Sequence, residues 1–234
     1  MTTRFKEKES KEPRRYGGLT AILVDGGFYR KRADIIFGPK SAKERADELE
    51  DYCKRHLTEH MFIHDLYRVL YYDCPPSNAK VYHPFKQEQV DLAKTKLYIW
   101  TNDFLYHLKT KRKFALRLGE LARLPAFSIK QRKLEDLLRG KITIKDLTEY
   151  DFVYSADQKG VDMKIGLDIA SLAYKKQVSQ IVLISGDSDF VAAAKLARRE
   201  GIDFVLDPMG AKINENLFEH IDALRSVDPK IRNK

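Results

Sequence analysis

Short apolar strands alternate with helices through the last third of this 234-residue sequence, and this alternation limits the fold more than any other feature. Strands and helices joined by short links form βαβ units, whose right-handed crossovers build a parallel sheet with helices on both faces. We therefore expect an α/β protein with a mainly parallel central sheet. The expected elements are a strand at 152–154, a helix at 162–177, a strand at 180–184, a helix at 188–200, a strand at 202–206 and a helix at 214–225.

Two further strands are expected earlier in the chain. The apolar run 19–24 stops at Asp25 and two glycines, as a buried parallel strand does, and a second run at 68–73 is closed by two prolines. Ser41 and Glu44 have the spacing of a capping box, which predicts a helix over 41–60. The remaining expected elements are a helix over 85–112 and short β-like pieces at 114–118, 126–129 and 142–144.

The domain organisation follows from composition and length. Residues 1–18 are polar and basic, which predicts a flexible tail. The rest suits one hydrophobic core, so we expect a single domain over 19–228 with a basic, β-rich insertion at about 113–150. The sequence has no long apolar span, no secretory signal at its start and no CxxC pair, and these features predict a cytoplasmic protein.

Basic residues are concentrated in one segment. The formal net charge is +9, and residues 106–141 hold eleven lysines and arginines against three acids, a local net charge of +8. A localised basic excess predicts a polyanionic partner, although solvated helix faces would give the same count. Aromatic residues such as Trp100 and Phe104 lie nearby and suit stacking on bases of single-stranded RNA, but their helical spacing fits core positions equally well.

Aspartates follow the predicted strands. Asp25 comes after the first strand, and Asp187 and Asp189 come after the strand at 180–184. Asp162 begins the preceding helix, and Asp168 lies about 240° further around it, so these two do not share a helix face. Ligands of an open parallel sheet bind beyond the carboxyl ends of its strands. Carboxylates gathered there need a cation, and oxygen ligands without histidine or cysteine favour Mg²⁺ or Mn²⁺.

Such a metal site would serve phosphodiester hydrolysis, because a divalent ion neutralises phosphate charge and activates water. Each acid also has a plainer explanation when taken singly. Asp25 would begin a turn, Asp189 would cap a helix and Asp162 would be the acid of a first helical turn. Their common position beyond the strand ends favours the metal site when they are taken together.

The same motifs resemble the NYN domain of the PIN-like nuclease superfamily, and within it the LabA/DUF88 family. The resemblance extends over about residues 19–226. It implies a Rossmann-like, three-layer PIN fold, a Mg²⁺ or Mn²⁺ cofactor and metal-dependent endoribonuclease activity on RNA. The matching segments are ILVDG at 22–26, VLYYDCPP at 69–76, QKGVD at 158–162 and LISGDSDF at 183–190.

The resemblance also implies roles for individual residues. Asp25, Asp162, Asp187 and Asp189 match the acidic catalytic and metal positions, and Asp168 matches a further acid on the same helix. Related domains often have an asparagine or similar polar residue shortly after the first aspartate, where this chain has Gly27 and Phe28. From the site edge and the basic segment we expect substrate contacts from Ser185, Lys159, Lys111, Arg112, Lys113, Arg117 and Arg132.

Two other functions remain as alternatives. A catalytically weak or inactive RNA-binding regulatory protein would keep the fold and the basic surface. A phosphatase of the haloacid-dehalogenase type would use Asp25 as nucleophile, but it needs a general acid two residues later, where Gly27 stands. The sequence leaves open the RNA target, the choice between RNA and DNA, and the oligomeric state, with a homodimer as one alternative.

A second metal site receives little support from the sequence. His56, His60 and His64 recur every four residues after Cys53, and histidines at this spacing on a helix can bind zinc. The pattern lacks an acid or second cysteine that would complete the ligand set. We expect these histidines to be packed or exposed rather than metal-bound.

Overall fold

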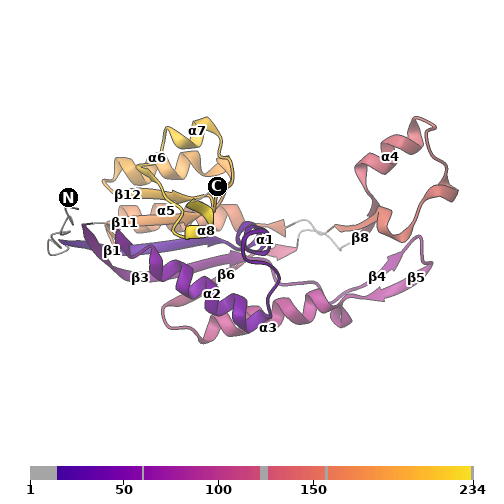
Figure 1. Cartoon of the computed structure of the whole chain (residues 1–234), viewed down its shortest axis with the longest axis horizontal. Coiled ribbons are helices and arrows are strands. Elements are labelled where there is room, and N and C mark those ends of the chain that lie inside the picture. Colours follow the sequence, from indigo (N-terminus) through magenta and orange to yellow (C-terminus); the bar gives the residue numbers. More distant parts are fainter. Residues whose placement is uncertain (1–14, 60, 122–125, 156–157, 233–234) are drawn as a thin grey trace, which may run out of the picture.

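The computed structural model describes residues 15–59, 61–121, 126–155 and 158–232, and a seven-stranded sheet lies at its centre (Figure 1). The described strands of this sheet pair in parallel, apart from the antiparallel β2–β3 pair at one edge. This arrangement confirms the predicted α/β fold of the PIN-like, Rossmann-like class. The strands in spatial order are β13 (Ala223–Leu224), β12 (Asp203–Asp207), β11 (Gln180–Ile184), β1 (Arg15–Asp25), β3 (Phe62–Asp73) and β2 (Thr58–Glu59), and β6 (Phe114–Leu118) also pairs with β3.

The alternating side chains of β1 divide the core into two layers. Ala21 and Leu23 pack against helices on one face of the sheet, and Ile22 and Val24 pack against helices on the other. All four are fully buried, because a central parallel strand is covered on both faces. The first face carries α5 (Val161–Tyr174) and α6 (Val191–Arg199), and the second carries α1 (Gly26–Phe37), α2 (Ala42–Arg55) and α3 (Lys96–Thr110).

Several expected elements differ from those in the structure. The predicted helix over 85–112 is wrong at its start, because residues 88–91 form a strand and α3 begins at Lys96, where the Thr95 hydroxyl accepts a hydrogen bond from the Tyr98 amide. The predicted helix over 214–225 is too long, since α7 (Glu215–Phe218) ends before β13. The remaining short helices near this end are the 3₁₀ helix η4 (Ser188–Phe190) and α8 (Pro229–Arg232).

A lobe made of residues 79–91 and 126–155 projects from the sheet (Figure 1). The His83 ring lies 4.3 Å from the Phe127 ring, and an ion pair of 2.6 Å joins Lys86 to Glu149, so the two segments form one unit. Its elements are β4 (Lys80–His83), β5 (Glu88–Asp91), β8 (Ala126–Ile129), α4 (Gln131–Leu138), η2 (Ile144–Asp146), η3 (Glu149–Asp151) and β9 (Phe152–Ser155). The 3₁₀ helix η1 (Leu92–Lys94) and the paired strands β7 (Glu120–Leu121) and β10 (Gln158–Lys159) join the lobe to the sheet.

The predicted bounds of the insertion and of the N-terminal tail differ from the elements of the structure. Residues 114–118 of the predicted insertion form β6 of the main sheet, whereas residues 126–150 belong to the lobe. The β-like piece expected at 142–144 is not a strand. Residues 1–14 of the predicted tail lie outside the described residues, and β1 begins at Arg15. The division of the chain into one domain stays a prediction.

Candidate active site

The ends of β1 and β11 bring Asp25 and Ser185 together. These strands are parallel neighbours in which Val24 stands opposite Ile184, so the next residue of each strand emerges at the same level. The Ser185 hydroxyl donates a 3.3 Å hydrogen bond to one oxygen of Asp25. The other Asp25 oxygen accepts a 3.0 Å bond from the Phe28 amide and thereby caps α1. Asp25 is therefore held in a fixed orientation from two sides.

The first turn of α1 lies tightly against the sheet. A side chain at Gly26 would place its Cβ only 2.4 Å from the Tyr71 hydroxyl and 2.6 Å from the Tyr72 carbonyl oxygen. Only a glycine permits this approach, since real Cβ atoms do not come so close to other atoms. Gly27 has no such neighbour, and its nearest contact is the Asp25 carboxylate at 3.6 Å. Of the two glycines after β1, close packing therefore requires only Gly26.

The loop after β11 presents Asp187 and Asp189. The Asp187 amide donates a 3.2 Å bond to the Ser185 hydroxyl, and the Asp187 carboxylate accepts a 3.0 Å bond from the Asp189 amide as the cap of η4. Gly186 lies against the Phe28 ring, where a Cβ would come within 2.6 Å. The side chains of Asp187 and Asp189 are exposed, so both are free to face a solvent-borne ligand.

Asp25, Asp162 and Asp187 line one open pocket of about 580 Å³. They come from the end of β1, the start of α5 and the loop after β11, so residues 162 positions apart in the sequence share this pocket. Lys31 from α1 and Lys212 from the loop after β12 lie on its wall. The chain topology thus brings these three acids to the same edge of the sheet, and their role as metal ligands stays a prediction.

Electrostatics indicate that the gathered acids disfavour each other's ionisation. Burial raises the pKa of Asp25 above its ordinary value, and the nearby carboxylates of Asp162 and Asp73 raise it further, against the hydrogen bonds from Phe28 and Ser185. Partial burial also raises the pKa of Asp162, with added repulsion from Asp187 and Asp189. A cation in the pocket would relieve this repulsion.

A divalent ion fits the donor chemistry of this pocket. Hard carboxylate oxygens are the ligands that Mg²⁺ and Mn²⁺ prefer. Within the described ranges, no three carboxylate, histidine or cysteine side chains are already close enough together to enclose a metal ion. Mg²⁺ commonly binds through one or two carboxylates and keeps several of its waters, so an open pocket with spaced acids still meets its requirements.

Asp168 lies elsewhere. Its carboxylate accepts a 2.8 Å hydrogen bond from the Tyr72 hydroxyl and forms a 3.0 Å ion pair with Arg117. It does not line the pocket that Asp162 shares with Asp25. The offset of about 240° between Asp162 and Asp168 around α5 accounts for this separation. Arg117, one of the expected substrate contacts, is thus occupied by Asp168.

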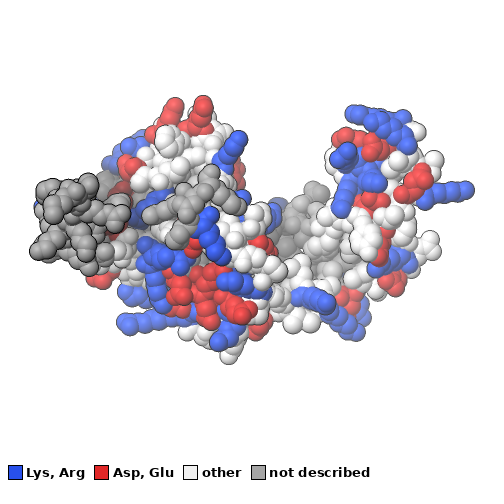
Figure 2. Space-filling model, in the orientation of Figure 1, with Lys and Arg blue, Asp and Glu red and all other residues white. Residues whose placement is uncertain are grey.

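Most of the predicted basic contacts lie away from the acidic pocket. Phe114 pairs with Val69, which pairs with Ile22, so the run 111–113 lies at least about 10 Å behind the level of Asp25 along the strands. Lys111 binds Asp47 and Glu50 on α2, where Figure 2 shows a patch of acidic side chains. Lys113 donates to the Leu66 carbonyl, Arg112 is exposed, Arg132 lies on α4 of the lobe and Lys159 is exposed on β10.

The sequence reasoning misses Lys31 and Lys212. Lys31 lies on α1, which the sequence pattern does not predict, because two glycines after a strand look like a turn. Lys212 follows the strand β12, and its position beyond a strand end is the signal that would have indicated it. The same rule that selects the aspartates therefore also selects this lysine.

The histidine series has a structural role where it is described. His56 is fully buried and lies 2.8 Å from the carboxylate of Asp207, which also accepts a 2.5 Å hydrogen bond from the Tyr52 hydroxyl. Burial lowers the pKa of His56. His60 lies outside the described residues. These contacts hold the end of β12 against α2, and neither His56 nor His64 lines the acidic pocket.

A mainly parallel α/β sheet flanked by helices is consistent with a PIN-like NYN fold. The chain belongs to the NYN domain family, whose model matches residues 79–220, more than half of its length. The NYN domain is part of the PIN-like nuclease superfamily, whose members generally depend on divalent metals, and NYN nucleases act on RNA. The matched region contains Asp162, Asp187 and Asp189, and Asp25 precedes it.

Comparisons with solved structures and with curated proteins give no further information about function. The chain is similar to a protein of unknown function from Vibrio parahaemolyticus, with 15% sequence identity over 95% of this chain and 98% of that chain and a TM-score of 0.47. No curated protein matches the chain. In the parts that the structure describes, no helix is both long and apolar enough to cross a membrane.

Proposed function

We propose that this protein is a metal-dependent endoribonuclease of the LabA/DUF88 type that cuts single-stranded RNA. The observation that carries the proposal is the single pocket lined by Asp25, Asp162 and Asp187. A Mg²⁺ or Mn²⁺ ion bound there would supply a Lewis acid that neutralises phosphate charge and activates water. The raised pKa values of Asp25 and Asp162 support the proposal, because a bound cation would favour the ionised carboxylates that burial and the neighbouring acids disfavour.

The residues that line the pocket, and Ser185 and Asp189 next to it, have distinct roles in this proposal. Asp25 and Asp187 bind the ion directly, with Asp25 oriented by Ser185 and by the Phe28 amide. Asp162 and Asp189 bind it through water or orient the attacking water. Lys31 and Lys212, which line the same pocket, hold the RNA phosphates. Asp168 is left out of the reaction and holds Arg117.

An RNA-binding protein without activity is the second candidate. It is favoured by the spacing of the acids, since no three of them are preassembled in the described residues, and by Gly27 and Phe28 after Asp25. The phosphatase alternative is disfavoured, because Gly27 in α1 offers no general acid two residues after Asp25.

Cleavage of a labelled single-stranded RNA by the full chain separates the first two candidates. The assay compares Mn²⁺ with EDTA and compares the wild type with Asp187→Asn, a change that keeps the side-chain cap of η4. Asp51→Asn on the exposed face of α2 serves as the matched control. We expect Mn²⁺-dependent cleavage that falls by about 10-fold or more in Asp187→Asn only. Equal cleavage by the wild type and Asp187→Asn would refute the nuclease, and RNA binding without cleavage would support the inactive protein.

A further inference from the structure

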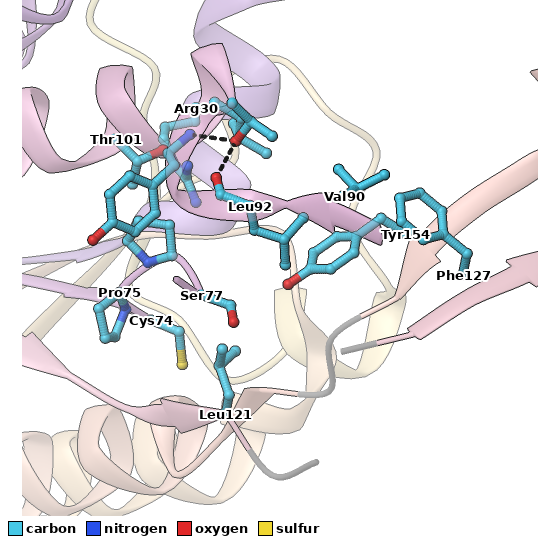
Figure 3. Close-up of a pocket in the computed structure, with 14 residues that line it drawn as sticks. Arg30, Cys74, Pro75, Ser77, Val90, Leu92, Thr101, Leu121, Phe127 and Tyr154 are labelled. Carbon is cyan, nitrogen blue, oxygen red and sulfur yellow. Dashed lines mark hydrogen bonds between the residues drawn. The ribbon is translucent and has the colours of Figure 1, made fainter. Parts of the chain in front are cut away.

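A second cavity, of about 280 Å³, lies between α3, the end of β3 and the lobe (Figure 3). Its lining is mainly apolar, with Leu92 and Leu121 on opposite sides in Figure 3 and Pro75 at its edge. The rings of Tyr98, Phe127 and Tyr154 form much of the wall. Flat aromatic walls with an apolar lining suit a flat ring system as ligand.

A buried polar group in this cavity lacks a partner. Thr101 is only 2% exposed, and its hydroxyl has no hydrogen-bond partner among the described residues. A threonine within a helix commonly bonds the carbonyl one turn earlier, so an unsatisfied hydroxyl is unusual, and this one lies just behind the cavity surface with almost no exposed area of its own. Ser77 and Arg30 add further polar groups to the lining. The cavity therefore offers a few fixed polar groups to the edge of a flat ligand.

The cavity adjoins the acidic pocket. Arg30 lines the cavity and Lys31, the next residue of α1, lines the acidic pocket. Arg30 is fixed by a 3.0 Å ion pair with the buried Asp73 at the end of β3. Asp25 pairs with Tyr72 in the sheet, so Cys74 at the cavity edge lies only two residues further along the neighbouring strand, about 8 Å away. A strand whose phosphate sits in the acidic pocket can therefore place a neighbouring base in the cavity.

We propose that this cavity binds one unstacked base of the single-stranded RNA, next to the phosphate held in the acidic pocket. The proposal rests on the proposed function for its choice of RNA. The aromatic walls stack on the base, and a rotation of the Thr101 side chain brings its unpaired hydroxyl to the cavity surface, where it bonds to the polar edge of the base. The cavity, at about 280 Å³, is small for a ligand site and so takes a single base rather than a longer stretch.

Two tryptophan variants on the same helix test the cavity. Leu97 lines it and is 62% exposed, whereas Ile99 is equally exposed at 60% and lies outside it, so neither change disturbs the core. Binding of a fluorescent single-stranded oligoribonucleotide is measured in EDTA, where no cleavage occurs. The larger ring of Leu97→Trp takes up part of the small cavity, so we expect it to weaken binding about fivefold or more, the lower end of what a stacked base contributes, and Ile99→Trp to leave binding unchanged. Equal effects of the two variants would overturn the proposal.

A third variant separates ligand binding from stability. Thr101→Val keeps the side-chain shape and removes the unpaired hydroxyl. We expect it to weaken RNA binding while the thermal stability stays equal or rises. Unchanged RNA affinity would contradict a role for this hydroxyl in base recognition.

Abasic oligonucleotides identify the base itself. Removing the base at one position after another should reveal one position whose loss weakens binding as much as Leu97→Trp does, with no further loss when both are combined. Additive effects would overturn the proposal. If 5′-mononucleotides bind in a Leu97→Trp-sensitive way but RNA does not, the ligand is a free nucleotide and the RNA proposal is wrong. These binding measurements are made without metal and therefore test base binding separately from catalysis. A protein that binds RNA in this way but does not cleave it would contradict only the proposed nuclease activity.

Discussion

The hydroxyl of Ser185 donates a hydrogen bond of 3.3 Å to Asp25 and ties the end of β11 to the end of β1. Ser185 is fully buried, whereas Asp25 reaches the open pocket, so the bond is partly buried. The same hydroxyl accepts a bond from the Asp187 amide, and one serine thus sets the relation between two of the proposed metal ligands. The acidic pocket follows from strand register and one shared hydroxyl rather than from a flexible loop.

The raised pKa of Asp25 predicts a pH-dependent effect of Asp25→Asn in metal-free protein. In the unfolded chain the Asp25 carboxyl loses its proton as the pH rises through about 3.9. In the folded protein its pKa is higher, so the carboxyl stays protonated to a higher pH. Stability therefore falls as the pH rises through the interval between these two pKa values, and the loss persists above it. Asparagine cannot ionise and still caps α1.

Thermal unfolding in EDTA should accordingly show Asp25→Asn more stable than the wild type by a few degrees at pH 7.5. The two proteins should unfold at nearly the same temperature at pH 3.5, and the exposed Asp51→Asn should show no such trend. If the difference in unfolding temperature between the two proteins is the same at both pH values, the fold does not raise the pKa of Asp25.

The two glycines after β1 should respond oppositely to alanine. Gly26→Ala pushes a Cβ against Tyr71 and the backbone of Tyr72, and overpacking of this kind costs about 1–3 kcal/mol. Gly27→Ala meets only an ordinary contact at 3.6 Å and gains up to about 1 kcal/mol of helix propensity in α1. Urea unfolding of the two variants measures both free energies. Equal destabilisation would show that the close approach of α1 to β3 is not what requires Gly26.

The sequence predicts the strands that carry the site but not everything around them. The run Gln180–Ile184 is recovered to the residue, because a fully buried parallel strand is uniformly apolar and ends at a glycine-containing turn. Asp25 and Asp187 are found by the same reasoning, since ligands lie beyond strand ends. Strand register, which decides whether they meet, follows from the parallel pairing of β1 with β11.

Contacts between segments that are distant in the sequence determine the features that the local sequence pattern does not predict. Residues 85–95 are rich in glutamine, glutamate and lysine, which favour a helix, yet β4 and β5 form a hairpin there because His83 packs on Phe127 and Phe152 of the lobe. Ring contacts between segments more than forty residues apart override local propensity. The basic segment 106–141 likewise appears as one surface in the sequence. In the structure, residues 111–113 lie near the amino end of β6, and β6 then runs towards the carboxyl edge of the sheet before the second segment of the lobe begins at Ala126.

Asp162 and Asp168 should differ in their effect on metal binding. Asp162→Asn removes a carboxylate that lines the acidic pocket, and we expect the affinity for Mn²⁺ to fall by about 10- to 100-fold. Asp168→Asn loosens the contact with Arg117 and Tyr72 and should cost roughly 1 kcal/mol of stability with little change in Mn²⁺ affinity. Isothermal titration with MnCl₂ provides the comparison. A larger loss in Asp168→Asn would reassign the metal ligand on α5.

Lys31 and Lys212 should dominate the salt dependence of RNA binding. Each phosphate contact to single-stranded nucleic acid contributes roughly 0.7 to the slope of log affinity against log salt. Lys31→Ala and Lys212→Ala should each reduce the slope by about that amount. Arg112→Ala, on the far edge of the sheet, should leave it nearly unchanged. If Arg112→Ala has the larger effect, the RNA runs over the basic segment instead of the pocket.

Anomalous diffraction from a crystal soaked in Mn²⁺ tests the proposed metal site most directly. We predict one strong peak in the acidic pocket, with carboxylate oxygens of Asp25 and Asp187 at about 2.0–2.3 Å from the ion. Manganese bound at another place, or carboxylates of Asp25 and Asp187 that stay too far apart to contact the same ion, would contradict the proposed site.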